Sequence, residues 1–310
     1  MTPFLYGQDN GELLIIHAKG ILYEETVSSI TEELRNDFKV TSLVVNQNAN
    51  SKLICEKIKQ KSPLLVVLMD NIAINVYEQC QSDKAIKKIP SISLMAIDVK
   101  KAIKTLDNAV GISYEVPVIT SVLNIQAIVD KKINRVGVIH RKFMKQFINI
   151  NKKYCLEENI YLKNVSLPNK GINFKKRIKK ELKKLLADDN IEAIWVPNDN
   201  QLLEKEIIKD IWIPMLNRYD KPAIVGIKQF VKPELHFGTF AIIPDHISLG
   251  TQTVDLIFEI QKNDWKIKKN YVVPPISIYK IINYNKLIND FDQKDFNLSI
   301  VDTVLQKIGS

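Results

Sequence analysis

The stretch Ile191-Glu192-Ala193-Ile194-Trp195-Val196-Pro197-Asn198-Asp199-Asn200 decides the fold of this chain. A short apolar run ends abruptly in residues with polar side chains. This pattern is typical of a buried strand in a parallel α/β sheet, where the residues that follow the strand reach the sheet edge that binds ligands. Residues 197–200 therefore predict one wall of a binding site.

The same pattern recurs along the chain. Most of the apolar runs are short and rich in Val and Ile, as buried parallel strands are. Amphipathic segments with helical spacing lie between them, for example residues 26–38 and 174–186. This regular alternation predicts an α/β protein built from doubly wound parallel sheets with right-handed crossovers. The ten predicted strands are residues 13–18, 42–46, 64–69, 92–97, 109–112, 136–139, 161–167, 193–196, 223–227 and 237–243.

The length of 310 residues is about twice that of a common single domain, so we expect two lobes. Residues 116–118 predict an extended crossing between them, because Pro117 restricts itself and its predecessor to extended geometry. Two more crossings are expected near residues 237–240 and 268–271. The predicted first lobe comprises residues 1–116 and 240–268, and the second comprises residues 117–239 and 269–310. Two such lobes joined by a hinge enclose a ligand cleft at their strand ends.

The composition excludes several classes of protein. The hydrophobic fraction of 45% and the charged fraction of 25% are ordinary for a globular protein, and no apolar run approaches the ~20 residues of a membrane-spanning helix. The net charge of +9 comes from Lys residues spread over many segments, which favours a solvated surface. The Lys residues of segment 174–186 lie opposite its apolar stripe, without interleaved aromatic residues that could stack on bases. We therefore expect a solvated outer helix and no nucleic-acid partner.

Cysteine and histidine residues are few and scattered. Cys55, Cys80 and Cys155 show no metal-ligand spacing, so the sequence predicts neither a disulfide framework nor a zinc site. We expect no metal and no cofactor. Residues 1–7 are too short for a complete signal peptide, and they are compatible with the tail of a trimmed signal, a cloning remnant or a true start.

Five short motifs follow one another over nearly the whole chain. They are Gly111-Ile112-Ser113, the strand that opens with Arg135-Val136-Gly137, the stretch Val196 to Asn200, the helix start Leu249-Gly250, and the segment from Ile282-Asn283 to Ile288. Together they resemble the ABC-transporter substrate-binding proteins with the type I periplasmic-binding fold. The resemblance implies a monomeric, two-lobed protein that closes on a small polar, amino-acid-like solute and delivers it to a membrane permease. It also implies a periplasmic or other extracytoplasmic location, and a cytoplasmic location stays open.

The resemblance also implies where the ligand binds. Asp199 and Asn200 would lie at the mouth of the second lobe, where a carboxylate accepts hydrogen bonds from a ligand amine. Ser113 and its neighbouring backbone N–H groups could bind a carboxylate. The residues expected to contact the ligand are Tyr23, Asp70, Asn71, Ser113, Glu115, His140, Arg141, Asp199, Asn200 and Asp245.

Two of these positions depart from the pattern of the family. The family usually has Gly-Thr-Pro-Ala after its third strand, where this chain has Met69-Asp70-Asn71-Ile72 and so a negative charge. The family's Asn-x-x-Glu-x-x-Ser after the strand that opens the second lobe is replaced here by His140-Arg141-Lys142-Phe143-Met144-Lys145, so that basic residues stand where the family has an acid. A standard α-amino acid in the usual orientation is therefore doubtful, and a different polar or cationic ligand or a reversed orientation is as compatible with the sequence.

Each candidate residue also has a purely structural interpretation. Asp70, Asp199 and Asp245 precede helices that they could simply cap. No nucleophile elbow, phosphate-binding glycine loop or HExxH helix is present, so we expect no enzymatic activity. The alternative to transport is a ligand-sensing module with the same bilobed fold and no dedicated permease.

Overall fold

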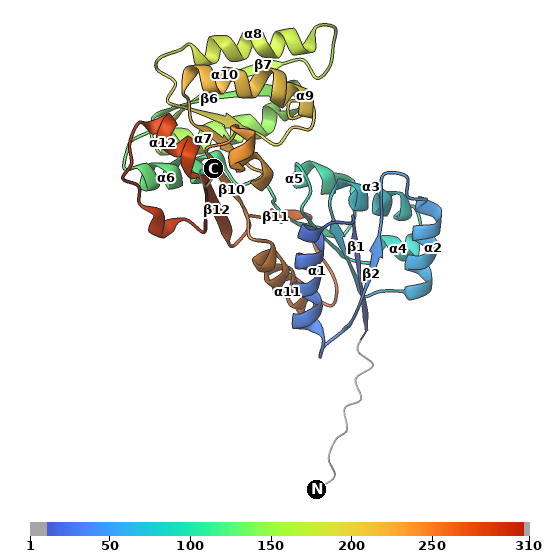
Figure 1. Ribbon diagram of the computed structural model, residues 1–310. Helices are drawn as coiled ribbons and strands as arrows, with labels where there is room; N and C mark the ends of the chain where they lie inside the picture. The colour runs from blue at the N-terminus through green and yellow to red at the C-terminus, as the bar shows by residue number, and fades with distance from the viewer. Residues whose placement is uncertain (1–10, 307–310) are drawn as a thin grey trace. The chain divides into compact units, whose positions relative to one another are not determined.

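The computed structural model describes residues 11–306, so the interpretations of residues 1–7 lie outside the described residues (Figure 1). The chain divides into two compact units. The first unit comprises Met1–Tyr114 and Pro244–Ser277, and the second comprises Glu115–Ile243 and Ile278–Ser310. Residues 269–277, which the sequence assigned to the second lobe, belong to the first unit because they add a strand to its sheet. Residues 115–116 and 240–243, which it assigned to the first lobe, belong to the second unit, where residues 240 and 241 pair within the sheet.

The first unit contains a six-stranded sheet with the order β11-β5-β4-β3-β1-β2, and its pairs are parallel. Leu13 and Ile15 of β1 pack on one face of this sheet, whereas Leu14 and Ile16 pack on the other. Both faces are covered, which explains why the strand is a continuous apolar run. The strands are β1 (Glu12–His17), β2 (Lys39–Val44), β3 (Leu65–Met69), β4 (Ser91–Leu94), β5 (Ala109–Ile112) and β11 (Tyr271–Val273).

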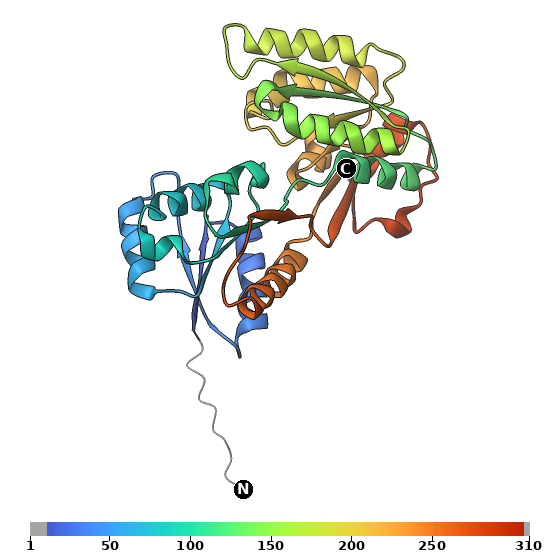
Figure 2. The same cartoon turned by 180° about the vertical axis from the view of Figure 1, so that it is seen from behind.

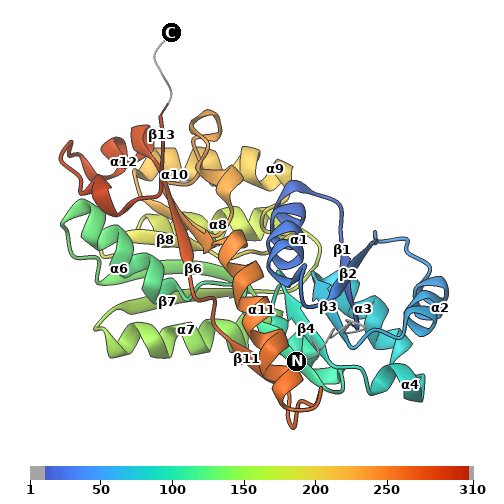
Figure 3. The same ribbon diagram turned by 90° about the horizontal axis from the view of Figure 1, so that it is seen from below.

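Helices cover the two faces of this sheet. On one face α1 (Ile21–Leu34) and α11 (His246–Lys262) lie side by side (Figure 3). Their apolar stripes, including Ile30 and Ile257, are buried against the sheet. The other face is covered by α2 (Ser51–Lys61), α3 (Asn71–Cys80), α4 (Lys84–Lys87) and α5 (Val99–Ala102).

A disulfide links Cys55 of α2 to Cys80 of α3, and their Cα atoms are 5.2 Å apart. The sequence-based expectation of no disulfide is therefore wrong. The two cysteines are 25 residues apart in the chain, and they meet only because α2 and α3 pack against each other on the same side of the sheet. Cys155 is buried and free.

The second unit contains a seven-stranded sheet with the order β13-β12-β10-β9-β8-β6-β7. The pairs of β6 with β7 and β8, of β9 with β8 and β10, and of β12 with β13 are parallel. The strands are β6 (Arg135–Arg141), β7 (Tyr161–Leu167), β8 (Ala193–Val196), β9 (Ala223–Val225), β10 (Phe240–Pro244), β12 (Ile278–Asn283) and β13 (Thr303–Leu305).

Two layers of helices enclose this sheet (Figure 2). Gly137 of β6 lies on the face covered by α8, where an added Cβ atom would lie 2.9 Å from Leu185. Glycine thus lets α8 approach the strand closely. One layer is formed by α8 (Phe174–Leu186), α9 (Lys205–Ile207) and α10 (Ile213–Tyr219), and the other by α6 (Val118–Val129), α7 (Lys145–Glu157) and α12 (Tyr284–Phe291).

The predicted architecture of alternating strands and helices in two parallel sheets is confirmed. All ten predicted strands are present, and α8 has the predicted bounds. Three strands escaped the sequence analysis, namely β11, β12 and β13. Among the described residues, no helix combines the length and the apolar character that a membrane span requires.

Candidate functional site

The candidate ligand residues are divided equally between the two units, and they lie at the carboxyl ends of strands, in the loops that follow or in the first turn of the next helix. In parallel sheets this edge is where ligands bind. The first unit contributes Tyr23, Asp70, Asn71, Ser113 and Asp245, and the second contributes Glu115, His140, Arg141, Asp199 and Asn200.

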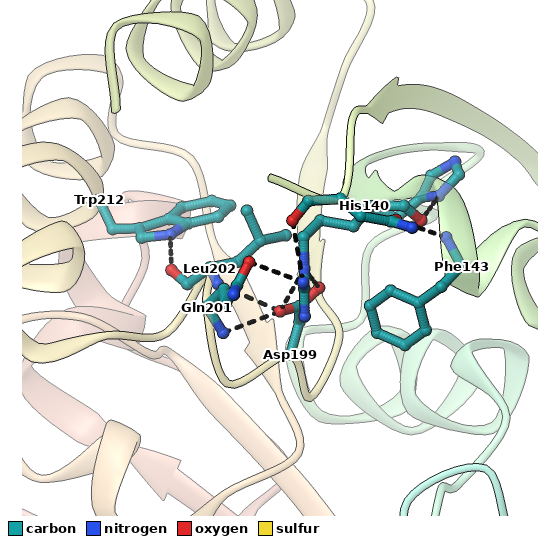
Figure 4. Close-up of polar contacts among 8 residues, drawn as sticks. His140, Phe143, Asp199, Gln201, Leu202 and Trp212 are labelled. Atoms are coloured by element: carbon teal, nitrogen blue, oxygen red, sulfur yellow. Dashed lines mark hydrogen bonds and ion pairs between the residues drawn. The ribbon is translucent and has the colours of Figure 1, made fainter. Parts of the chain in front are cut away.

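Arg141 and Asp199 form the central pair of the second unit. The Nε atom of Arg141 donates to Oδ2 of Asp199 at 2.7 Å and to Oδ1 at 2.9 Å. Oδ1 also accepts the backbone N–H groups of Gln201 at 2.9 Å and Leu202 at 3.2 Å. Figure 4 shows this convergence of donors on Asp199, whose side chain has an exposed fraction of 0%. The carboxylate is therefore occupied by the protein itself.

Three residues that the sequence analysis missed complete the environment of Arg141. Its Nη1 atom donates to the carbonyl oxygen of Asn169 at 3.1 Å and to Oε1 of Gln201 at 2.7 Å. Its guanidinium carbon lies 4.6 Å from the ring centroid of Phe143, within the range of a cation–π contact. The Arg141 side chain retains an exposed fraction of 11%. The cluster thus holds a guanidinium in a fixed orientation at the sheet edge.

His140 lies beneath this cluster and is fully buried. Its Nδ1 lies 2.9 Å from the carbonyl oxygen of Arg141, and its Nε2 lies 3.2 Å from Nδ2 of Asn164. Because Oδ1 of Asn164 accepts from Lys152, its Nδ2 donates to Nε2, and the proton of the neutral ring is on Nδ1. Burial lowers the pKa of His140 below its ordinary value. His140 therefore supports the backbone of Arg141 as a neutral ring.

Asp70 and Tyr23 form the corresponding cluster of the first unit. Oδ1 of Asp70 accepts the backbone N–H groups of Ile72 at 2.8 Å and Ala73 at 2.9 Å, so Asp70 caps α3. Tyr23 and His17 lie close enough to the Asp70 side chain to influence its ionisation. Burial raises the pKa of Asp70, and burial together with the Asp70 charge raises the pKa of Tyr23 to about 12.

The backbone of Asp70 is strained. Its φ of 88° and ψ of 171° fall in a region that is essentially restricted to glycine. Backbone strain of this kind costs on the order of 1–3 kcal/mol and clusters at functional sites. A charged side chain is thus held at the sheet edge at an energetic cost.

Other candidates have structural partners or are exposed. The side chain of Asn71 is bound to the backbone N–H and carbonyl groups of Ile97. Asp245 caps α11 through the N–H groups of residues 247 and 248. The backbone N–H of Ser113 donates to Val273, Glu115 is half-buried, and Asn200 is exposed. Within residues 11–306 no group of three or more His, Cys, Asp and Glu side chains could hold a metal ion.

No protein-family model matches the sequence, and a comparison with curated proteins gives no match. Solved structures do match. A ligand-free, open substrate-binding protein with adhesive properties from Clostridium difficile has a TM-score of 0.70 at 15% identity, over 96% of this chain and 100% of the other. An ABC domain in complex with L-Trp from Streptococcus pneumonia has a TM-score of 0.60 at 18% identity, over 96% and 100%.

A periplasmic ribose ABC transporter protein from Conexibacter woesei is also similar, with a TM-score of 0.54 and 11% identity over 92% of this chain and 95% of the other. At these identities the likeness concerns the fold. The chain therefore has the fold of the type I periplasmic binding proteins, and the predicted resemblance to the substrate-binding proteins of ABC transporters is confirmed at the level of the fold.

Proposed function

We propose that this chain is the solute-binding component of an ABC importer and captures a small polar solute by hinge closure. The observation that carries this proposal is the pair of charged clusters at strand ends, Arg141 with Asp199 in one unit and Asp70 with Tyr23 in the other. Each cluster keeps a charged side chain largely out of water with partners fixed by the fold, as a preorganised binding site requires. The similarity of the fold to substrate-binding proteins supports the same role.

The chemistry of the clusters suggests how a solute is recognised. Because the Asp199 carboxylate is buried and fully occupied, the group that the second unit presents is the Arg141 guanidinium, which suits an anionic or carbonyl group. In the first unit Asp70 suits a cationic or hydrogen-bond-donating group. We therefore propose a solute with both kinds of group, which fits an amino-acid-like compound bound in the reversed orientation.

The disulfide provides evidence about the compartment in which the protein is located. Disulfides persist in oxidising compartments, so Cys55–Cys80 supports a periplasmic or other extracytoplasmic location. A protein of this kind works as a monomer with a membrane permease. No catalytic motif in the sequence favours an enzyme.

A thermal-shift screen of the purified chain tests the proposal, with amino acids including L-tryptophan, polyamines and nucleosides as probes. A solute at about 100 times its Kd should stabilise the protein by ~2.7 kcal/mol. The stabilising solute should then lose affinity in both Arg141→Gln and Asp70→Asn, but not in Lys104→Gln, a control at an exposed position outside the candidate site. If the solute stabilises both variants as much as it stabilises the unchanged chain, the clusters are not its binding site. If cells that lack the gene take up the solute at an unchanged rate, the result favours a sensing role over transport.

A further inference from the structure

Helix α8 of the second unit carries an unusual concentration of positive charge. Seven of its 13 residues are Lys or Arg, against the single acidic residue Glu181. The apolar side chains Ile178, Leu182 and Leu185 are buried against the sheet, and the basic side chains are exposed on the other side of the helix. The helix therefore presents an almost uniformly basic face to its surroundings.

Most of this charge has no acidic partner. Lys175 pairs with Glu206, and Lys184 pairs with Glu181. The side chains of the other five basic residues form no ion pair or hydrogen bond with any part of the chain that the structure describes. We call them the α8 basic face, which comprises Lys176, Arg177, Lys179, Lys180 and Lys183.

The arrangement is costly for the isolated protein. Lys176 and Lys180, and likewise Lys179 and Lys183, are four residues apart on the helix, where like charges destabilise it by about 0.2–0.5 kcal/mol per pair. The first unit contains 17 basic and 17 acidic residues, so the whole net charge of +9 belongs to the second unit. An anionic partner would relieve this repulsion.

A large apolar side chain stands beside the α8 basic face. Ile172, two residues before the helix, has an exposed fraction of 89%. Its neighbours Lys170, Gly171 and Asn173 are also exposed, and a Cβ atom on Gly171 would meet no atom within 4 Å. The loop therefore projects an isoleucine next to a row of lysines.

We propose that the α8 basic face and Ile172 form a docking surface for an anionic lipid bilayer. Lysine and arginine side chains are attracted to the headgroups of anionic lipids, and an exposed aliphatic side chain can enter the interfacial region. The apolar stripe of α8 is already buried in the protein core, so the contact is peripheral and electrostatic. The outer face carries no aromatic side chain for base stacking, which favours lipid over nucleic acid.

Sedimentation of the intact chain with lipid vesicles tests this proposal. The protein should bind vesicles of equimolar phosphatidylglycerol and phosphatidylcholine and should not bind vesicles of phosphatidylcholine alone. High sodium chloride should release it, because salt screens exposed charges. The triple variant Lys176→Gln/Lys180→Gln/Lys183→Gln should bind the anionic vesicles about 100-fold more weakly, and Ile172→Ser should weaken binding several-fold.

A matched control variant tests whether vesicle binding depends on the α8 basic face or only on the net charge of the protein. Lys100, Lys101 and Lys104 of the first unit are also exposed, and they lie within five residues of one another on α5 and the turn that follows it. Lys100→Gln/Lys101→Gln/Lys104→Gln removes the same charge and should bind the anionic vesicles like the unchanged chain. Both triple variants should keep the thermal midpoint of the unchanged chain, since all six side chains are exposed.

Three outcomes would overturn the proposal. The first is equal binding to both kinds of vesicle, and the second is an equal loss of binding in the two triple variants. The third is release from anionic vesicles by short duplex DNA that binds the α8 basic face more tightly, which would assign this face to nucleic acid.

Discussion

Arg141 and Asp199 are 58 residues apart in the chain, yet Nε of Arg141 lies 2.7 Å from one carboxylate oxygen of Asp199 and 2.9 Å from the other. Arg141 is the last residue of β6, and Asp199 follows β8, its neighbour in the sheet. Asp199 thus has two roles. It turns the chain after β8 through two backbone N–H groups, and it fixes the guanidinium that the second unit presents.

Replacing Asp199 by Asn should separate these roles. The amide oxygen can still accept the N–H groups of Gln201 and Leu202, but the ion pair to Arg141 is lost. We expect the free energy of unfolding to fall by about 2 kcal/mol, the size of a hydrogen bond to a charged group. Urea unfolding measures this change. The neighbouring variant Asn200→Ala should stay within about 0.5 kcal/mol of the unchanged chain, and an equal loss in both variants would argue against a special role for the pair.

At position 70, replacement by glycine should destabilise the protein less than replacement by alanine. Asp70→Ala removes the cap of α3 and keeps the strained backbone, so we expect a loss of about 1–2 kcal/mol. Asp70→Gly also removes the cap but relieves strain of the order of 1–3 kcal/mol. The glycine variant should therefore be more stable than the alanine variant in chemical denaturation. The opposite order would show that the backbone of Asp70 is not strained.

The pKa of His140 predicts a pH dependence of stability. Burial lowers the pKa of His140 in the folded protein, so the unfolded chain binds the proton more readily. The stabilising contribution of the neutral ring is complete above the unfolded pKa of about 6.5 and is lost as pH falls through the folded value. Asp70 and Asp290, whose pKa values are raised by burial, act in the opposite direction.

Comparison with a variant isolates the contribution of His140. The difference in unfolding free energy between the unchanged chain and His140→Gln should shrink as pH is lowered from 7.5 to 5, roughly the range in which histidine titrates. Urea unfolding at several pH values measures it. A difference that is constant over this range would mean that His140 titrates normally.

The sequence predicts most of the strands well because strands such as β1, β3 and β8 are apolar runs buried on both faces. It fails for β11 and β13, which have three residues each and are only partly buried, and for β12, in which only the last three residues are buried. It identifies Arg141 and Asp199 as candidates but not as partners, because a pattern of apolar runs does not reveal which strands become neighbours. The same limit explains the missed disulfide, whose cysteines meet only through the packing of α2 on α3.

The Cys55–Cys80 disulfide should contribute measurably to the stability of the first unit. Closing a loop of 25 residues restricts the unfolded chain, and its loss should cost about 3 kcal/mol. Unfolding with and without dithiothreitol measures this difference, and Cys155→Ala provides a control for thiol modification elsewhere. Under denaturing, non-reducing conditions only Cys155 should react with a thiol reagent. Equal unfolding curves with and without reductant would contradict the contribution.

Lys286 and Asp290 of α12 form a buried ion pair at 2.9 Å. Asp290 also accepts a hydrogen bond from Thr239. Lys286→Met leaves the Asp290 carboxylate buried without its cation, and we expect a loss of about 3–5 kcal/mol. Lys286→Met with Asp290→Leu removes both charges, so it should recover most of this stability even though it deletes more polar contacts. A double variant as unstable as Lys286→Met, measured by urea unfolding, would show that packing around α12, rather than an unpaired charge, causes the loss.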